Sequence, residues 1–188
     1  MTDTLNHLFE IDQEVFLWLN GMHNSFWDNI MLFVTNKFTW IPMYVLMLYG
    51  IVKKLGRDSI GIILAILAAV ALADYIASGL FKPYFMRPRP CHDPVIGSLV
   101  HVVAGCGGPF GFVSSHASTS FAIVTSALLL PSRSIKGIKF LCLWALVYAY
   151  SRVYVGVHYP LDIVFGALIG LITGYFSYLL YRIIEQRR

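Results

Sequence analysis

The chain has 188 residues, of which 57% are apolar and only 13% charged, against about 25% charged residues in soluble domains. So few charges cannot cover a water-exposed surface, and the composition excludes cytosolic, secreted, fibrous and disordered proteins. The net charge of +4 comes from Lys and Arg residues that are spread between apolar stretches. They form no basic stripe with interleaved aromatic residues, which argues against a nucleic-acid partner.

The first 24 residues predict an amphipathic helix that lies on the membrane surface. Phe9, Phe16 and Leu17 alternate there with acids and amides. The segment 1–24 contains several acids but no Lys or Arg, which is the opposite of the charge that opens a cleaved signal peptide. We therefore expect no such peptide.

Apolar stretches suited to membrane helices follow, since a hydrocarbon core of about 30 Å is crossed at about 1.5 Å per residue. Polar residues around Asn36 interrupt the first stretch, so a pair of short re-entrant helices over 25–52 is an alternative. We predict an all-α fold: one membrane-embedded bundle of about five to six transmembrane helices over 1–188, with an outer-side loop at 82–114. The predicted helices are 27–52, 58–81, 115–131, 137–152 and 160–182.

Basic residues set the orientation of this bundle. Nine of them follow the first, third and fifth helices, which end on one side, and five lie on the other. We expect the first side, with the C-terminus, to face the cytoplasm, and the second to face outward from a prokaryotic inner membrane. The nine are Lys53, Lys54, Arg57, Arg133, Lys136, Lys139, Arg182, Arg187 and Arg188; the five are Lys37, Lys82, Arg87, Arg89 and Arg152.

The fifth predicted helix carries glycines at every fourth position, at Gly166, Gly170 and Gly174. Such a face of small residues lets another helix approach closely. We expect it to pack within the bundle; a dimer seam is the alternative, and the oligomeric state stays open.

Three polar clusters lie on the outward side, within 82–90, 111–116 and 151–162. Lys82, Arg89 and Arg152 are cations at one depth, and they would repel one another unless an anion lay among them. The planar fork of arginine donates two parallel hydrogen bonds to a phosphate. The clusters therefore predict a phosphate-binding site.

The second cluster supplies further anion ligands from a helix start. Ser114 suits the N-cap of the third helix, because it follows a glycine-rich run. The free N–H groups of Ser115, His116 and Ala117 would then face the anion, with help from the helix dipole.

Two histidines supply the predicted reactivity. Pro160 suits the first position of the fifth helix, which brings Asp162 in its first turn within reach of His158. A carboxylate on one imidazole nitrogen orients the ring and leaves the other nitrogen as a nucleophile. His116 would then be the acid that protonates the leaving oxygen.

This arrangement resembles the type 2 phosphatidic acid phosphatase superfamily, whose pattern is K-x6-RP, PSGH and SR-x5-H-x3-D. Val113 and Ser115 stand where that pattern has proline and glycine. The backbone N–H of Ser115 must therefore face the phosphate at a position where the family has a glycine. The resemblance implies a lipid phosphatase that needs no metal or cofactor and forms a phosphohistidine on His158. The matching positions are Lys82, Arg89, Pro90, Ser114, His116, Ser151, Arg152, His158 and Asp162.

The resemblance also implies a lipid phosphate as the substrate: undecaprenyl diphosphate, phosphatidylglycerol phosphate, phosphatidic acid or the phosphates of lipid A. The loop around Cys91 and Cys106 resembles small phosphatases of this superfamily, some of which act on lipid A. Two alternatives to a lipid phosphatase remain; the first would use the same residues for catalysis, and the second would use none of them. The first is a phosphotransferase that passes the phosphate to a second lipid, and the second is a non-catalytic transporter or scaffold.

The outer-side loop holds the remaining expectations. Cys91 and Cys106 lie where disulfides persist, so we predict a bond between them, with two unpaired thiols as the alternative. Arg87 has no place in the family pattern, so we expect a headgroup contact or a solvated charge. His92, Asp93 and His101 could form a metal site with the cysteines. We favour the interpretation that they are solvated side chains of the loop. Cys142 lies inside the fourth predicted helix and should be a free buried thiol.

Overall fold

The computed structural model describes residues 2–187, which form helices joined by turns and one long loop. Among these residues the only β-type pairing is an isolated bridge between Pro88 and Phe110. The predicted all-α class is confirmed. The α-helices are α1 (Thr2–Gly21), α2 (Ser25–Thr35), α3 (Ile41–Leu55), α4 (Ser59–Asp74), α5 (Lys82–Phe85), α6 (Ser115–Leu129), α7 (Phe140–Tyr154) and α8 (Pro160–Glu185).

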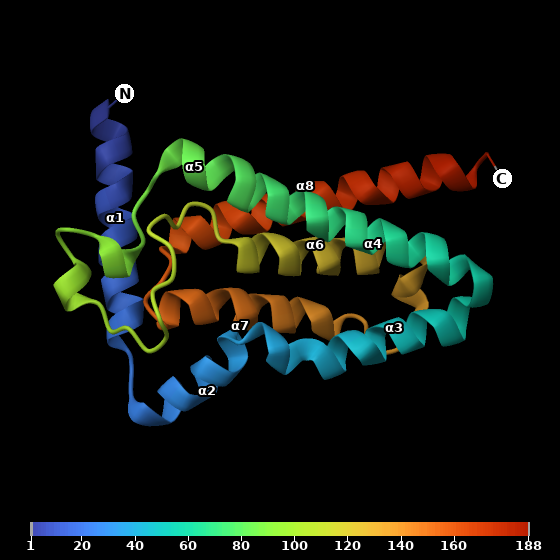
Figure 1. The fold of residues 1–188 in the computed structure, drawn as a ribbon, viewed down its shortest axis with the longest axis horizontal. Coiled ribbons are helices and arrows are strands. Elements are labelled where there is room, and N and C mark those ends of the chain that lie inside the picture. Colours follow the sequence, from blue (N-terminus) through green and yellow to red (C-terminus); the bar gives the residue numbers. More distant parts are fainter. Residues whose placement is uncertain (1, 188) are drawn as a thin grey trace.

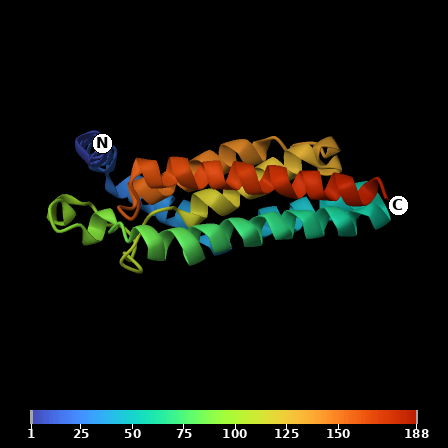
Figure 2. The ribbon, with the colours of Figure 1, turned by 90° about the horizontal axis from the view of Figure 1, so that it is seen from above.

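Figure 1 shows α3, α4, α6, α7 and α8 extended along the long axis of the molecule, with α1 across one end. Helix α6 packs against α4, α7 and α8, so it lies at the centre of the bundle. Both views place the loop of residues 86–114 at the end where α1 lies, and the C-terminus at the opposite end (Figures 1 and 2).

Two stretches of the described chain are long and apolar enough to cross a membrane, Lys37–Phe85 and Pro160–Glu185. The first contains α3 and α4, which a turn at Gly56–Asp58 joins and which lie next to each other in Figure 1. Helix α7 is apolar but shorter. The number of spans and the surface position of α1 remain predictions.

The first predicted helix, 27–52, is wrong as a single helix. The chain leaves the helical conformation at Asn36, which ends α2 and caps a short 3-10 turn by accepting the N–H of Phe38. An asparagine competes for backbone hydrogen bonds in this way, so the polar interruption seen in the sequence is a helix boundary. The second predicted helix runs further than expected, because a π-helical segment at Tyr75–Phe81 continues α4 into α5.

The glycine face of α8 packs against α6. A Cβ atom added at Gly166 would lie 2.6 Å from the carbonyl oxygen of Ser114, and one at Gly174 would lie 2.6 Å from Cβ of Thr125. Gly170 faces Ser118 in the same way. The predicted packing within the bundle is confirmed, and it brings the start of α8 beside the start of α6.

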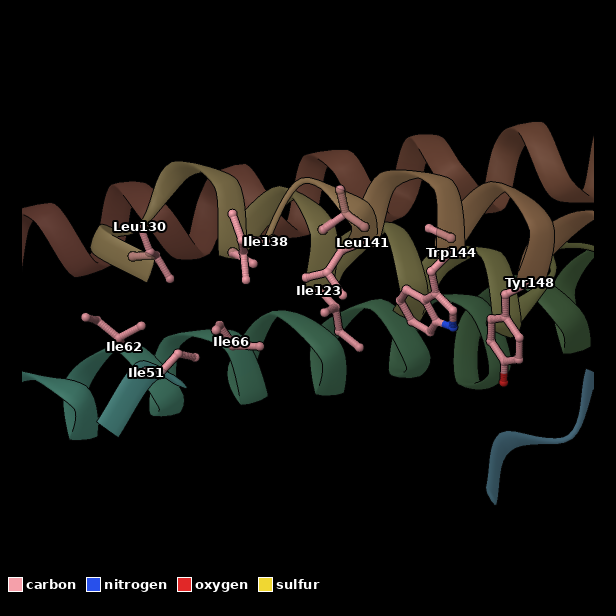
Figure 3. Packing of buried hydrophobic residues seen from close by; sticks show 12 residues of the cluster. Ile51, Ile62, Ile66, Ile123, Leu130, Ile138, Leu141, Trp144 and Tyr148 are labelled. Carbon is pink, nitrogen blue, oxygen red and sulfur yellow. The ribbon is translucent and has the colours of Figure 1, made fainter. Parts of the chain in front are cut away.

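Aliphatic and aromatic side chains fill the bundle between α3, α4, α6 and α7 (Figure 3). Large apolar side chains also cover its outside, among them Leu46, Ile60 and Phe140, all of which are exposed. A bundle that is apolar on both faces suits a lipid surrounding rather than water. The labelled core residues are Ile51, Ile62, Ile66, Ile123, Leu130, Ile138, Leu141, Trp144 and Tyr148.

Candidate active site

The three polar clusters meet at the end of the bundle where α1 crosses. Helix α5 ends there, α6 and α8 begin there, and α7 ends there. Two backbone hydrogen bonds join the clusters directly: the N–H of Gly111 donates to the carbonyl of Arg87, and the N–H of Ser114 donates to that of Asp162. Segments far apart in the sequence thereby form one site.

His158 and Asp162 form a buried pair. Nδ1 of His158 lies 3.2 Å from Oδ2 of Asp162, and the two side chains are 2% and 0% exposed. The same carboxylate oxygen accepts the N–H of Tyr159 at 3.1 Å, as part of a capping box at the start of α8. The carboxylate therefore holds the Nδ1 side of the ring, so Nε2 is the nitrogen that could attack a phosphate.

The surroundings of His158 keep its imidazole neutral. Burial lowers the pKa of His158 well below its ordinary value, and the positive charges of Arg152, Arg89 and Lys82 lower it further. A neutral ring at pH 7 is the form that has a lone pair on Nε2.

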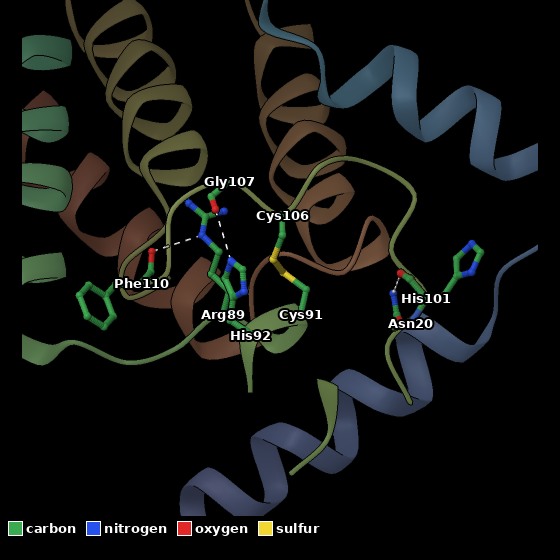
Figure 4. Close-up of a disulfide and its surroundings, with 8 residues drawn as sticks. All are labelled: Asn20, Arg89, Cys91, His92, His101, Cys106, Gly107 and Phe110. Carbon is green, nitrogen blue, oxygen red and sulfur yellow. Dashed lines mark hydrogen bonds between the residues drawn. A yellow bond between two sulfur atoms is a disulfide. The ribbon is translucent and has the colours of Figure 1, made fainter. Parts of the chain in front are cut away.

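The three cations hold polar groups of the protein but no carboxylate. Nζ of Lys82 donates to Oγ of Ser115 at 3.0 Å, and Nε of Arg89 donates to the carbonyl oxygen of Phe110 at 3.3 Å (Figure 4). Nη1 of Arg152 donates to Oγ1 of Thr35 at 2.6 Å. Among the described side chains of residues 6–187, none of the three cations makes an ion pair, so their charge is available to an anion.

Arg152 also has an unused donor. Its Nε atom is buried and has no hydrogen-bond partner among the described residues. A buried donor of this kind is costly unless a ligand accepts its hydrogen bond.

The start of α6 has the predicted cap. Oγ of Ser114 accepts the N–H of Ala117 at 3.5 Å, and Ser114 is fully buried. The expectation that the N–H of Ala117 faces the anion is therefore wrong, because the cap uses it. Oγ of Ser115 lies 2.7 Å from Oγ of Ser78 as well as beside Lys82, so this hydroxyl joins α6 to the α4–α5 segment. The ring of His116 stacks on Tyr148, with 4.9 Å between centroids.

Arg87 has a different environment from the one predicted. Its side chain is only 13% exposed and bridges two buried carboxylates. Nη1 donates to Oδ1 of Asp162 at 3.0 Å, and Nη2 donates to Oδ2 of Asp12 at 2.7 Å. The expectation of a headgroup contact or a solvated charge is wrong, because α1 supplies a carboxylate that the motifs do not contain.

Gly111 is a second residue of the site that the motifs did not single out. A Cβ atom there would lie 3.0 Å from Oδ2 of Asp162 and 3.5 Å from Nδ1 of His158. The pair therefore packs against bare backbone. In the sequence, Gly111 was marked only by its place in the glycine-rich run and at the start of the second polar cluster.

In the structure a disulfide joins Cys91 to Cys106, as predicted (Figure 4). Cys142 is a free cysteine in α7, but it is half-buried and not buried as predicted. The bond closes the outer loop beside Arg89, whose guanidinium would lie 3.8 Å from a Cβ atom at Gly107. The carbonyl of Gly107 also lies 3.3 Å from Nε2 of His92.

The alternative metal site is not assembled from the residues considered for it. Cys91, His92 and Cys106 lie close together, but the two sulfur atoms are bonded to each other. Asp93 accepts the hydroxyl of Tyr159 at 2.8 Å, and His101 lies 3.1 Å from Asp28 of α2.

An apolar groove leads away from the site along the bundle. It has a volume of about 500 Å³ and is lined mainly by side chains of α3, α4, α6 and α7. Ser115 and His116 form part of its polar end, and Asp74 lies on its wall, where its carboxylate accepts a hydrogen bond from Ser78. The groove thus runs from α3 and α4 to Ser115 and His116, two residues of the candidate site.

An apolar helical bundle with a cluster of unpaired cations and a His–Asp pair at one end is the architecture of a membrane enzyme that acts on phosphate. The chain belongs to the PAP2 superfamily, whose family model matches residues 62–185. The predicted resemblance is confirmed, and the chain is a phosphatase of this family.

Two relatives and one solved structure illustrate the membership. The chain is 36% identical to a lipid A 4'-phosphatase of Bacteroides thetaiotaomicron, over 93% of this chain and 78% of the relative. It is 33% identical to a lipid A 4'-phosphatase of Porphyromonas gingivalis, over 97% of this chain and 78% of the relative. The crystal structure of Aquifex aeolicus LpxE superposes with a TM-score of 0.63 at 26% identity, covering 87% of this chain and 92% of that one.

Proposed function

We propose that the protein removes a phosphate group from lipid A at the outer face of the inner membrane, through a phosphohistidine on His158. The observation that carries the proposal is the buried His158–Asp162 pair next to three cations without carboxylate partners. The two lipid A 4'-phosphatases among the relatives support this substrate over the other lipid phosphates.

In the proposed reaction, Nε2 of His158 attacks phosphorus while the bond from phosphorus to the lipid oxygen breaks. Asp162 holds the ring and stabilises the positive charge that develops on it. His116 gives a proton to the leaving lipid oxygen, and water then cleaves the N–P bond to release phosphate.

The phosphate oxygens would lie among Lys82, Arg89, Arg152 and the N–H groups of Ser115 and His116. Preorganised donors of this kind stabilise the charge of the transition state without reorganising during the step. Because the chain itself supplies these cations, we propose that the reaction needs no metal.

The groove supports a lipid substrate. Its apolar walls on α3 and α4 would hold acyl chains while the phosphate reaches His116 and Ser115. A disulfide at the same end supports an outward-facing site, since such bonds persist in oxidising compartments. In this orientation the C-terminus, at the opposite end of the bundle, is cytoplasmic.

The test is phosphate release by the purified full-length protein from lipid A, undecaprenyl diphosphate, phosphatidylglycerol phosphate and phosphatidic acid, each with and without EDTA. We expect the highest kcat/KM with lipid A, unchanged by EDTA and inhibited by vanadate, which mimics the trigonal phosphoryl group. The His158→Ala protein is the matched control. Activity that EDTA removes and a divalent metal restores would contradict the metal-free mechanism, and transfer of the phosphate to a second lipid would show a phosphotransferase.

A further inference from the structure

The contacts of Arg87 connect α1 to the proposed nucleophile. Asp162 uses its two oxygens differently: Oδ1 accepts from Arg87, whereas Oδ2 faces His158 and the N–H of Tyr159. Arg87 therefore fixes the free edge of the carboxylate that orients the imidazole. The planar guanidinium of Arg87 donates from two nitrogens to two carboxylates, and the single ammonium group of a lysine cannot reproduce this geometry.

Asp12 in turn fixes Arg87. Its Oδ2 accepts from Arg87, and its Oδ1 accepts the N–H of Leu161 in the first turn of α8 at 2.9 Å. One side chain of α1 thus holds both the arginine and the helix turn that carries Asp162. Burial raises the pKa of Asp12, and the hydrogen bond from Arg87 opposes that rise.

Two aromatic rings and a backbone hydrogen bond also hold Arg87 in place. Its guanidinium stacks on the ring of Tyr159, 4.0 Å from the centroid, and a second ring, that of Phe9, lies 5.0 Å away. Its backbone carbonyl accepts the N–H of Gly111, the glycine that packs against the His158–Asp162 pair. Both ends of the residue are therefore anchored to parts of the site.

We propose that Arg87 and Asp12 are positioning residues for the Asp162–His158 pair, so that α1 is a component of the catalytic apparatus. The inference rests on the proposed function for its kinetic consequence only. Neither residue is among the phosphate ligands proposed above, so their loss should impair the attack by His158 more than the binding of phosphate.

The kinetic test compares Asp12→Asn, Arg87→Gln and Arg87→Lys with the wild type. We expect kcat to fall about 10- to 100-fold in the first two, as for a small misplacement of a reacting group, with a smaller loss in Arg87→Lys. The KM and the inhibition constant of inorganic phosphate, which binds as a ground-state ligand, should stay within about twofold. Unchanged kcat in both Asp12→Asn and Arg87→Gln would overturn the proposal.

The matched control is Asn20→Ala, which loosens α1 without touching Arg87. Asn20 also anchors α1, by donating to the carbonyls of His101 and Tyr154 and accepting the N–H of His101. We expect this variant to keep kcat within about threefold. A loss as large as that of Asp12→Asn would show that docking of α1 in general, and not the Arg87 contact, carries the effect.

A spectroscopic readout separates this inference from the proposed function. In protein labelled with ¹⁵N-histidine, the proton between Nδ1 of His158 and Asp162 should give a downfield signal that His158→Asn removes. We expect the signal to shift or to broaden by exchange in Arg87→Gln and to stay in place in Asn20→Ala. If the wild type hydrolyses no lipid phosphate, the proposed function fails, and this signal still decides whether Arg87 positions the pair.

Discussion

The two ends of the bundle are held together by different kinds of contact. At the site end, directional contacts join the segments: Arg87 between two carboxylates, Asn20 on backbone carbonyls, and the disulfide at Cys91. At the opposite end, buried aliphatic side chains such as Ile62 and Leu130 pack against one another without polar partners.

This difference predicts how each end responds to substitution. Removing one partner of a buried ion pair leaves an uncompensated charge and costs about 3–5 kcal/mol. Removing one methyl group from an aliphatic core costs about 1 kcal/mol, because the remaining contacts persist. Loss of the charged contacts of Asp162 or of the disulfide at the site end should therefore lower both activity and stability. Substitutions at the far end should lower stability in small increments and leave activity unchanged.

The largest expected effect is the loss of turnover in His158→Ala. The substitution removes the atom that attacks phosphorus, so no covalent route remains, whereas His116→Ala removes only proton donation, which contributes roughly 10²–10⁴-fold. Phosphate release from lipid A measures both variants. Turnover in folded His158→Ala at the level of His116→Ala would contradict the assignment of the nucleophile.

Next in size is the effect of the disulfide. Replacing Cys91 and Cys106 with serine opens a loop with a sequence separation of 15, and on the chain-entropy model this costs about 3 kcal/mol. We expect a lower thermal midpoint in detergent and a partial loss of activity, because Arg89 loses its support. The control Cys142→Ser should change neither quantity, and full activity in the double variant would show that the loop orders Arg89 without the bond.

A smaller effect is expected from pH. The pKa of His158 is lowered in the folded protein, so below about pH 6.5 the unfolded chain binds a proton that the folded protein does not. Stability therefore falls as the pH falls through this range, by up to about 1.4 kcal/mol per pH unit from this residue. Thermal unfolding between pH 5 and pH 8 should show a shallower pH dependence in His158→Asn than in the wild type; equal slopes would contradict the neutral buried ring.

The smallest effect is expected at the apolar end. Ile62→Val should lower the free energy of unfolding by about 1 kcal/mol and leave kcat unchanged, since Ile62 is fully buried among aliphatic side chains far from any polar residue of the site. A denaturation series in detergent with a parallel activity assay measures both. A loss of activity here as large as that in the disulfide variant would show that the two ends are coupled.

Local spacing in the sequence was enough for much of the fold and of the site. Pro160 begins α8 and Ser114 caps α6, as expected from their residue types. The reach of Asp162 back to His158 follows from its place in the first turn of α8, directly after the Tyr159 cap. The glycines of α8 predicted close packing. These features depend on residues within a few positions of one another, where backbone geometry leaves little choice.

Only the tertiary structure decided the role of α1 and of Arg87. Asp12 and Arg87 are 75 residues apart, and nothing in their spacing places α1 against the start of α8. The sequence alone determined an all-helical, lipid-compatible chain with the motifs of a phosphatase, because periodicity, composition and short-range spacing are local properties. Contacts between distant buried charges depend on how whole helices pack, and that is why the Asp12–Arg87–Asp162 connection emerged only from the folded molecule.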